Sequence, residues 1–163
     1  MDVLAAQVGA ALKSHGLMLT TAESCTGGWV SQMVTGVAGS SAWFERGFVT
    51  YSNLSKQQML GVSEATLQQY GAVSESTVRE MAEGALRYST AQVSLAVSGI
   101  AGPDGGTPDK PVGTVWFAWA IKHGMVHAEC HHFSGNRDEV RAHAVQIALQ
   151  GILDALNRHT LTS

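Results

Sequence analysis

Residues 17–37, LMLTTAESCTGGWVSQMVTGV, pass from an apolar, threonine-rich run into a helix-like pattern across two adjacent glycines. The run at 17–22 predicts a short buried strand, and the apolar spacing over 27–37 predicts a helix. A turn between a strand and a helix exposes main-chain N–H groups that have no partner inside the helix. Ser24 lies in this turn, where such groups would either bind an anion or stabilise the oxyanion of an acyl transfer.

The rest of the chain alternates between helical and strand-like patterns. Helical spacing of apolar residues predicts further helices over 2–15, 64–70, 76–88 and 138–158. Ser52 or Asn53 is expected to cap one more short helix, which runs through Met59 and stops at Gly61. Short apolar or alternating runs predict strands over 44–52, 93–97, 114–121 and 125–133. This order predicts an α/β fold: a three-layer α/β/α domain with a mixed, mainly five-stranded sheet and a C-terminal hairpin plus long helix.

Length and composition fit a single domain over residues 1–163. Hydrophobic residues make up 45% and charged residues 14% of the chain, which is ordinary for a globular protein. A net charge of -3 argues against a general nucleic-acid binder, since those proteins carry a basic stripe. Cys25 and Cys130 lie far apart without CxxC spacing, so we expect neither a disulfide framework nor a structural zinc site.

Nothing in the sequence indicates export or membrane insertion. The first 16 residues are interrupted by Asp, Gln, Lys and His, so they lack the continuous apolar core of a signal peptide. No stretch has the length of a transmembrane helix. We therefore expect a cytoplasmic protein that does not bind membranes.

Ser24 admits two interpretations from its position alone. A serine before a helix commonly caps it, and a strand, a turn and a Gly-Gly pair also form a general anion-binding arrangement. The GxSxG motif of the hydrolase elbow is absent here. Cys25 is a rival nucleophile, although a small buried cysteine more often packs behind such a loop. A catalytic Ser24 therefore needs a base from elsewhere in the chain.

Lys56 is one candidate base. In YSNLSK, residues 51–56, Tyr51 is expected to end a strand and Lys56 lies in the first turn of the next helix. A cation is unfavourable in that turn, and burial in a pocket would lower the pKa of the amine further toward that of a catalytic base. The alternative is a surface lysine that points into water.

The histidines suggest no obvious base. Five of the histidines considered lie late in the chain, at positions 123, 127, 131, 132 and 143. His127 and His131 share one strand face with Glu129 between them. That pattern is more typical of a solvated strand face than of a metal cluster.

Two further segments are candidates for binding an anion. The loop SGIAGPDGG, from Ser98 to Gly106, follows a buried strand but matches neither the phosphate loop nor the GxGxxG pattern. Its glycines either let the backbone approach a ligand closely or simply form a long turn. Arg137 and Arg141 lie one helical turn apart at the start of the last helix. They either hold a phosphate together or form ion pairs at the surface.

Five motifs taken together resemble one family. They are TAESCTGG, FERGFVTYSNxxK, VSGIAGPDGG, KPVGTVWFA and FSGNRDEVR, and the likeness extends from about residue 5 to 155. The family is that of the C-terminal domain of the CinA competence/damage-inducible proteins, in particular its stand-alone nicotinamide-nucleotide amidases. The resemblance implies an amidohydrolase that converts nicotinamide mononucleotide into nicotinate mononucleotide and ammonia, in pyridine-nucleotide recycling, with no metal or redox cofactor. Larger relatives carry an additional N-terminal domain, and activities tied to that domain are not transferred.

The same resemblance implies roles for individual residues. The nucleophile falls on Ser24, the general base on Lys56 and a supporting hydroxyl on Tyr51. Main-chain N–H groups around three residues would then stabilise the oxyanion, namely Thr26, Gly27 and Gly28. The remaining candidate substrate-binding residues are Asn53, Ser98, Gly99, Gly102, Arg137 and Arg141.

The expected partner is a small molecule, and the expected assembly is a homo-oligomer, with a dimer as the simplest form. Trp43, Phe44 and Trp116 are apolar residues that would be exposed on a monomer, unless they belong to the core. Two rival functions stay open: a non-catalytic nucleotide-binding module in which Ser24 is only a helix cap, and an amidase of a related small carboxamide.

Overall fold

The computed structural model describes residues 1–162, with side chains described through residue 160. In that part of the chain, five strands form one mixed sheet in the order β2-β1-β3-β4-β5. Strands β1, β2 and β3 are parallel, whereas β4 and β5 are antiparallel and form the late hairpin. The strands are β1 (Leu19–Glu23), β2 (Phe44–Val49), β3 (Val93–Gly99), β4 (Thr114–Ile121) and β5 (Val126–His132).

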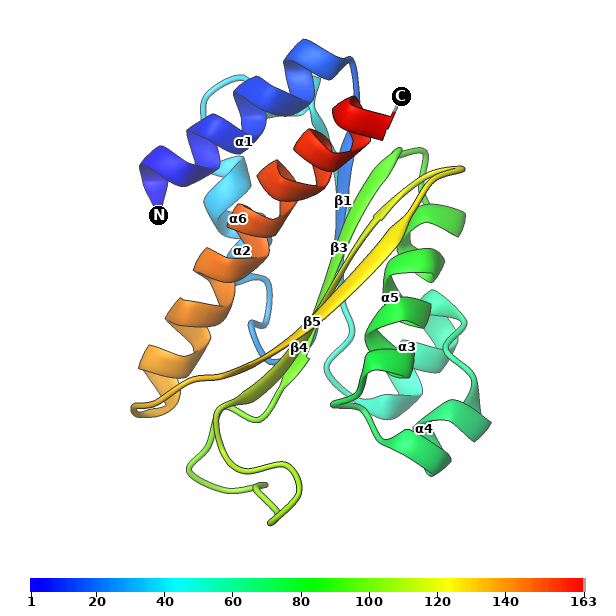
Figure 1. Cartoon of the computed structure of the whole chain (residues 1–163), viewed down its shortest axis with the longest axis vertical. Coiled ribbons are helices and arrows are strands. Elements are labelled where there is room, and N and C mark those ends of the chain that lie inside the picture. Colours follow the sequence, from blue (N-terminus) through cyan, green and yellow to red (C-terminus); the bar gives the residue numbers. More distant parts are fainter. Residues whose placement is uncertain (163) are drawn as a thin grey trace.

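Helices cover both faces of the sheet (Figure 1). One layer holds α1 (Asp2–His15), α2 (Trp29–Thr35) and the long α6 (Arg137–Thr162). The other holds α3 (Asn53–Leu60), α4 (Glu64–Tyr70) and α5 (Glu75–Arg87). A short 3-10 turn, η1 (Ser40–Ala42), precedes β2. The predicted three-layer α/β/α architecture with a C-terminal hairpin and long helix is therefore confirmed.

Most element ends follow from local chemistry. Three serines begin helices by accepting a hydrogen bond from a main-chain N–H three residues later: Ser52, Ser63 and Ser74. Gly16 and Gly61 end α1 and α3 in the left-handed conformation. The predicted ranges accordingly agree with the observed ones to within a few residues. The largest differences are the 44–52 strand, which ends at Val49, and the last helix, which continues to Thr162.

Trp43 is only 3% exposed, so of the two places open to it from the sequence, an exposed surface or the core, it occupies the core. Its indole packs where α1 carries Gly9, and a Cβ at that glycine would lie 2.5 Å from the ring. Because Gly9 has no side chain, α1 leaves room for the indole of Trp43. Phe44 and Trp116 are half-buried against the cores on the two faces of the sheet. No helix among the described residues is long and apolar enough to cross a membrane.

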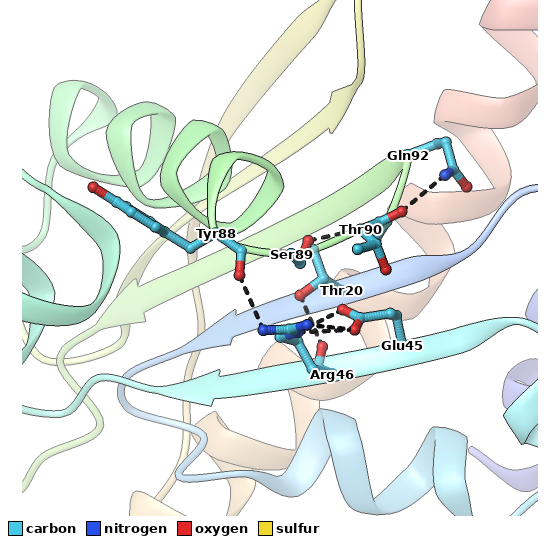
Figure 2. A network of polar contacts seen from close by, with 8 residues as sticks. Thr20, Glu45, Arg46, Tyr88, Ser89, Thr90 and Gln92 are labelled. Atoms are coloured by element: carbon cyan, nitrogen blue, oxygen red, sulfur yellow. Dashed lines mark hydrogen bonds and ion pairs between the residues drawn. The ribbon is translucent and has the colours of Figure 1, made fainter.

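A polar network ties the edge strand β2 to the segment between α5 and β3, near the start of the parallel strands (Figure 2). Arg46 donates to the Glu45 carboxylate at 2.7 Å and to the main-chain oxygen of Tyr88 at 3.2 Å. The main-chain oxygen of Arg46 accepts a hydrogen bond from Thr20 at 2.8 Å. Charged side chains at a sheet edge also discourage pairing with other strands. The candidate site lies at the opposite end of the sheet, where β1 and β3 end.

Candidate active site

A cavity of about 290 Å³ lies at the carboxyl ends of the parallel strands, where ligands bind in open α/β sheets. Segments far apart in the sequence line it: Ser24 and Cys25 after β1, Tyr51 and Lys56 after β2, Ala72 and Val73 before α5, Ser98–Gly102, Asp104 and Gly105 after β3, and Arg137 at the start of α6. Parallel pairing of β1 with both β2 and β3 brings the segments that follow these strands to one place.

Ser24 and Lys56 are in direct contact at this end of the sheet. The Lys56 Nζ lies 3.0 Å from the Ser24 Oγ, 2.9 Å from the Thr50 main-chain oxygen and 3.1 Å from the Tyr51 main-chain oxygen. Ser52 begins α3, which places Lys56 one turn inside the helix. Helical side chains tilt toward the helix N-terminus, so the amine points back toward the turn after β1.

The proton inventory of the lysine determines what this contact can do. Both carbonyl oxygens accept hydrogen bonds only, so each requires an N–H from Nζ. A neutral amine has two N–H groups and one lone pair. When Lys56 is neutral and donates to both carbonyls, its lone pair faces the Ser24 hydroxyl and accepts a hydrogen bond from it. When it is protonated, it donates to the Ser24 Oγ, and the hydroxyl can turn toward the Tyr51 carbonyl at 3.4 Å.

Burial makes the neutral amine accessible near physiological pH. Lys56 is 1% exposed, and desolvation lowers its pKa from 10.5 to about 8, with Cys25 acting in the opposite direction. Cys25 beside it is also buried, which raises its thiol pKa to about 11. A thiol with that pKa is almost fully protonated at neutral pH and is a poor nucleophile. The electrostatics therefore favour Ser24 over its neighbour.

Glu23 performs the capping role that Ser24 was considered for. The carboxylate is fully buried and accepts four hydrogen bonds of 2.6–2.9 Å: from the Thr26 hydroxyl, the Val30 and Ser31 main-chain N–H groups and the Ser31 hydroxyl. The residue at the cap position of α2 is Gly28, and Ser24 makes no cap hydrogen bond. The interpretation of Ser24 as a helix cap is therefore wrong.

The same carboxylate weakens the interpretation of this turn as a phosphate cradle. The N–H groups that begin α2 already bind Glu23, so they are not available to an anion. A second negative charge beside a buried carboxylate would also be repelled. Nothing in the sequence pattern singled out Glu23. The available signal was a charged residue at the end of an apolar strand, directly before the turn.

The turn after Ser24 nevertheless contains unused N–H groups. The Ser24 N–H donates to Val97 O and the Gly27 N–H donates to Ser24 O, both at 3.0 Å. The N–H groups of Cys25 and Thr26 have no acceptor among the described residues. Gly27, expected to supply an oxyanion donor, therefore already uses its N–H to close the turn. The unpaired donors nearest the nucleophile belong to the two residues that follow it.

The structure separates Arg137 from Arg141. Arg137 lines the cavity and donates to Gly102 O at 2.8 Å and to the Tyr51 phenol at 3.4 Å. Arg141 does not line the cavity. It donates instead from Nε to Cys25 O at 3.0 Å and from Nη2 to Thr26 O at 3.2 Å. The two ends of Tyr51 also have different contacts. Its main-chain oxygen contacts Lys56, whereas its phenol lies beside Arg137. The residue as a whole is 64% exposed.

The other candidate residues divide by position. Ser98, Gly99 and Gly102 line the cavity. Asn53 is exposed as the first residue of α3, and it lies outside the lining, as do Thr26, Gly27 and Gly28. Sequence reasoning missed two contributors besides Glu23: the Thr50 carbonyl and the Ala72–Val73 wall. Asp104, which also lines the cavity, belongs to the Ser98–Gly106 loop that the sequence had indicated.

The histidine-bearing face of β5 is distant in sequence and separate from this cavity. His127 and His131 each lie about 3 Å from the Glu129 carboxylate between them, at 3.0 and 3.1 Å, and all three side chains are partly exposed. No set of three or more His, Cys, Asp or Glu residues suited to a metal ion occurs in the described part of the chain.

Comparison with known proteins finds relatives over almost the whole chain. The model of the CinA C-terminal domain matches residues 1–156. The nicotinamide-nucleotide amidohydrolase PncC of Escherichia coli K12 is 58% identical over 159 residues, which cover 96% of this chain and 95% of that protein. The protein of the same name from Pseudomonas putida is 51% identical and is covered to 95%. A CinA-like protein of Akkermansia muciniphila is also 51% identical, but the match covers 36% of its length.

Solved structures show the same fold. The competence/damage inducible protein CihA of Agrobacterium tumefaciens superposes with a TM-score of 0.91 at 46% identity, covering 96% of this chain and 94% of that one. A CinA superfamily protein of Klebsiella pneumoniae gives a TM-score of 0.92 at 39% identity, with 96% and 98% covered.

Proposed function

The chain belongs to the CinA C-terminal domain family, and from this premise and the contact between Ser24 and Lys56 we propose that it is a nicotinamide-nucleotide amidohydrolase. Its substrate is nicotinamide mononucleotide, and its products are nicotinate mononucleotide and ammonia, as in the recycling of pyridine nucleotides. The names of the stand-alone relatives support the substrate. The observation that carries the chemistry is the buried lysine amine 3.0 Å from a serine hydroxyl.

The proposed reaction proceeds through an acyl-enzyme. Neutral Lys56 takes the Ser24 proton as Oγ bonds to the carboxamide carbon, which gives a tetrahedral oxyanion. Lys56 then returns that proton to the nitrogen, the C–N bond breaks and ammonia leaves. Water attacks the resulting ester as Lys56 takes one of its protons. Lys56 then returns that proton to the Ser24 Oγ as the ester bond breaks, which restores the serine and releases the acid product, which ionises to the carboxylate. One amine therefore serves as base and acid in both halves of the reaction.

The oxyanion is stabilised first by the N–H group of Cys25, which lines the cavity, and second by the unpaired N–H group of Thr26, a buried residue that follows it in the turn. They directly follow the nucleophile, and donors fixed in advance stabilise a charge that develops in the transition state. Loss of a single such donor typically costs about 3–4 kcal/mol of barrier. The neighbouring N–H of Ser24 is excluded because it already donates to Val97 O.

The ribose and phosphate bind against the Ser98–Gly102 segment and Arg137. Both line the cavity, and a guanidinium group is well suited to bind phosphate. Arg137 uses two of its donors on Gly102 O and the Tyr51 phenol, which leaves others for the ligand. The Tyr51 phenol thus assists binding, while its carbonyl orients the lysine.

We propose that the protein is a cytoplasmic homodimer. Both cysteines are free, as is usual in a reducing compartment. Apolar residues such as Val49, at the end of β2, and Leu54, in the first turn of α3, are 47% and 58% exposed, and a second subunit would cover them. Light scattering of the purified protein distinguishes the dimer from a monomer.

The proposed activity is tested by incubating the protein with nicotinamide mononucleotide and measuring ammonia and nicotinate mononucleotide together. Ser24→Ala and Lys56→Met should abolish turnover, whereas Lys122→Met, an exposed lysine in the β4–β5 hairpin, should not. Turnover by Ser24→Ala that disappears in Cys25→Ala would transfer the nucleophile to Cys25. Tight binding without turnover by the wild type would favour the non-catalytic nucleotide-binding module. Turnover of free nicotinamide or another carboxamide alone would change the substrate and keep the mechanism.

A further inference from the structure

Arg141 is the one cation that contacts the turn after the nucleophile from outside the cavity, within the described part of the chain. It lies one turn into α6, half-buried, and its guanidinium carbon is 5.5 Å from the centre of the Trp29 ring. Its Nε donates to the Cys25 carbonyl and its Nη2 to the Thr26 carbonyl, at 3.0 and 3.2 Å. Two carbonyls and an aromatic face therefore fix one guanidinium plane.

These carbonyls belong to the peptide groups that form the turn. The peptide between Cys25 and Thr26 carries the Cys25 carbonyl at one end and the free Thr26 N–H at the other. Because a peptide group is planar and trans, fixing the direction of its carbonyl fixes that of its N–H. A positive charge at the carbonyl end also polarises the peptide group and strengthens the N–H as a donor.

The remaining peptide groups of the turn are held in a related way. The Ser24 carbonyl, in the same peptide group as the free Cys25 N–H, accepts from the Gly27 N–H. The Thr26 carbonyl, in the peptide group that supplies this Gly27 N–H, accepts from Arg141 and from the Trp29 N–H. Arg141 thus contacts one donor's peptide group directly and supports the other through Gly27.

We propose that Arg141 is a positioning residue that holds and polarises the oxyanion donors of Cys25 and Thr26, and that it does not bind the substrate phosphate. This inference rests on the proposed serine hydrolase function. It assigns different tasks to two arginines one helical turn apart: Arg137 faces the cavity and binds ground-state substrate, whereas Arg141 acts through the main chain on the transition state.

The two tasks predict opposite kinetic effects. A lost transition-state interaction lowers kcat, and a lost ground-state interaction raises KM. Arg141→Met, which keeps the alkyl packing against Trp29, should lower kcat at least about tenfold with KM changed less than about threefold. The effect should stay below the ~10²–10³-fold loss seen when an oxyanion donor is itself removed. Arg137→Met should instead raise KM and change kcat little. Arg87→Met, an exposed arginine on the other helical layer, is the matched control.

Chemical rescue separates a guanidinium effect from general disruption. In Arg141→Ala, millimolar guanidinium or ethylguanidinium should restore part of kcat, and the same salts should not affect Arg87→Met. Arg141→Lys should fall between the wild type and Arg141→Met, because an ammonium group cannot serve both carbonyls in the fork geometry. A wild-type kcat for Arg141→Met, or a raised KM alone, would overturn the inference.

A second measurement does not depend on the physiological substrate. A serine-directed fluorophosphonate reacts at Ser24 through a phosphorus–oxygen group that occupies the oxyanion site, with fluoride as the leaving group. Arg141→Met should slow labelling of Ser24 at least about tenfold, as followed by intact mass, while Arg87→Met should label at the wild-type rate. Wild-type labelling without turnover of nicotinamide mononucleotide would overturn the proposed substrate alone. Equal labelling of Arg141→Met and wild type would overturn the role of Arg141 alone.

Discussion

The buried lysine makes a quantitative prediction about stability as well as catalysis. Folding lowers the pKa of Lys56 from 10.5 to about 8, and at about 1.4 kcal/mol per pH unit this shift is worth about 3 kcal/mol. Between pH 8 and 10.5 the unfolded state binds the proton more tightly, so the free energy of unfolding rises with pH over that range. Below pH 8, Lys56 is protonated in both the folded and the unfolded state, so the full ~3 kcal/mol of destabilisation is present.

Lys56→Met removes this titration. The variant also loses the hydrogen bonds to the Thr50 and Tyr51 carbonyls, which costs about 1–3 kcal/mol for each buried acceptor left unpaired. Its stability at a single pH is therefore not diagnostic, whereas the change of its stability with pH is. From pH 7 to pH 9.5 the wild type should gain about 2 kcal/mol relative to the variant.

Urea unfolding of both proteins across this range measures the difference directly. The surface variant Lys122→Met should follow the wild type at every pH, because its lysine is exposed. If the free-energy difference between wild type and Lys56→Met stays constant from pH 7 to 9.5, Lys56 titrates normally in the folded protein and the reasoning fails.

Three further predictions follow from single contacts. Glu23→Gln should destabilise the protein by about 3 kcal/mol in urea unfolding, because an amide cannot accept from all four donors and loses charge-assisted hydrogen bonds. Gly84→Ala should destabilise it by ~1–3 kcal/mol, since the added Cβ meets the Leu60 carbonyl on the neighbouring helix. Cys25 should resist iodoacetamide at pH 8, monitored by peptide mass, because with a pKa of about 11 about one thiol in a thousand is ionised.

Each of these predictions has a contrary outcome. Wild-type stability of Glu23→Gln would mean that the four hydrogen bonds to this side chain do not hold the turn as described. A neutral Gly84→Ala would mean that α3 and α5 do not pack as closely as described. Rapid alkylation of Cys25 at pH 8 would restore it as a rival nucleophile.

The architecture was predictable because hydrophobic periodicity and capping residues agree along most of the chain. Ser52, Ser63 and Ser74 begin helices where the sequence places polar residues before apolar spacing. Trp43 shows the limit of such reasoning. Its burial depends on Gly9, 34 positions earlier, and no local pattern connects the two residues.

The site was partly predictable for a similar reason. Residue types and motif order point to Ser24 and Lys56, but their contact depends on β2 pairing beside β1. The roles of main-chain atoms could not be read from side-chain identity: Lys56 contacts the carbonyl of Tyr51, not its phenol. The different tasks of Arg137 and Arg141 likewise depend on how α6 lies against the turn.

The pH dependence of kcat/KM for nicotinamide mononucleotide tests the central claim most directly. The account predicts a single ionisation in the free enzyme near the Lys56 pKa of about 8, with activity at pH 7 about one tenth of the plateau above pH 9. Any residual activity of Lys56→Met should lack this ionisation. A flat profile from pH 6.5 to 9.5, or the same midpoint in Lys56→Met, would contradict a mechanism in which neutral Lys56 activates Ser24.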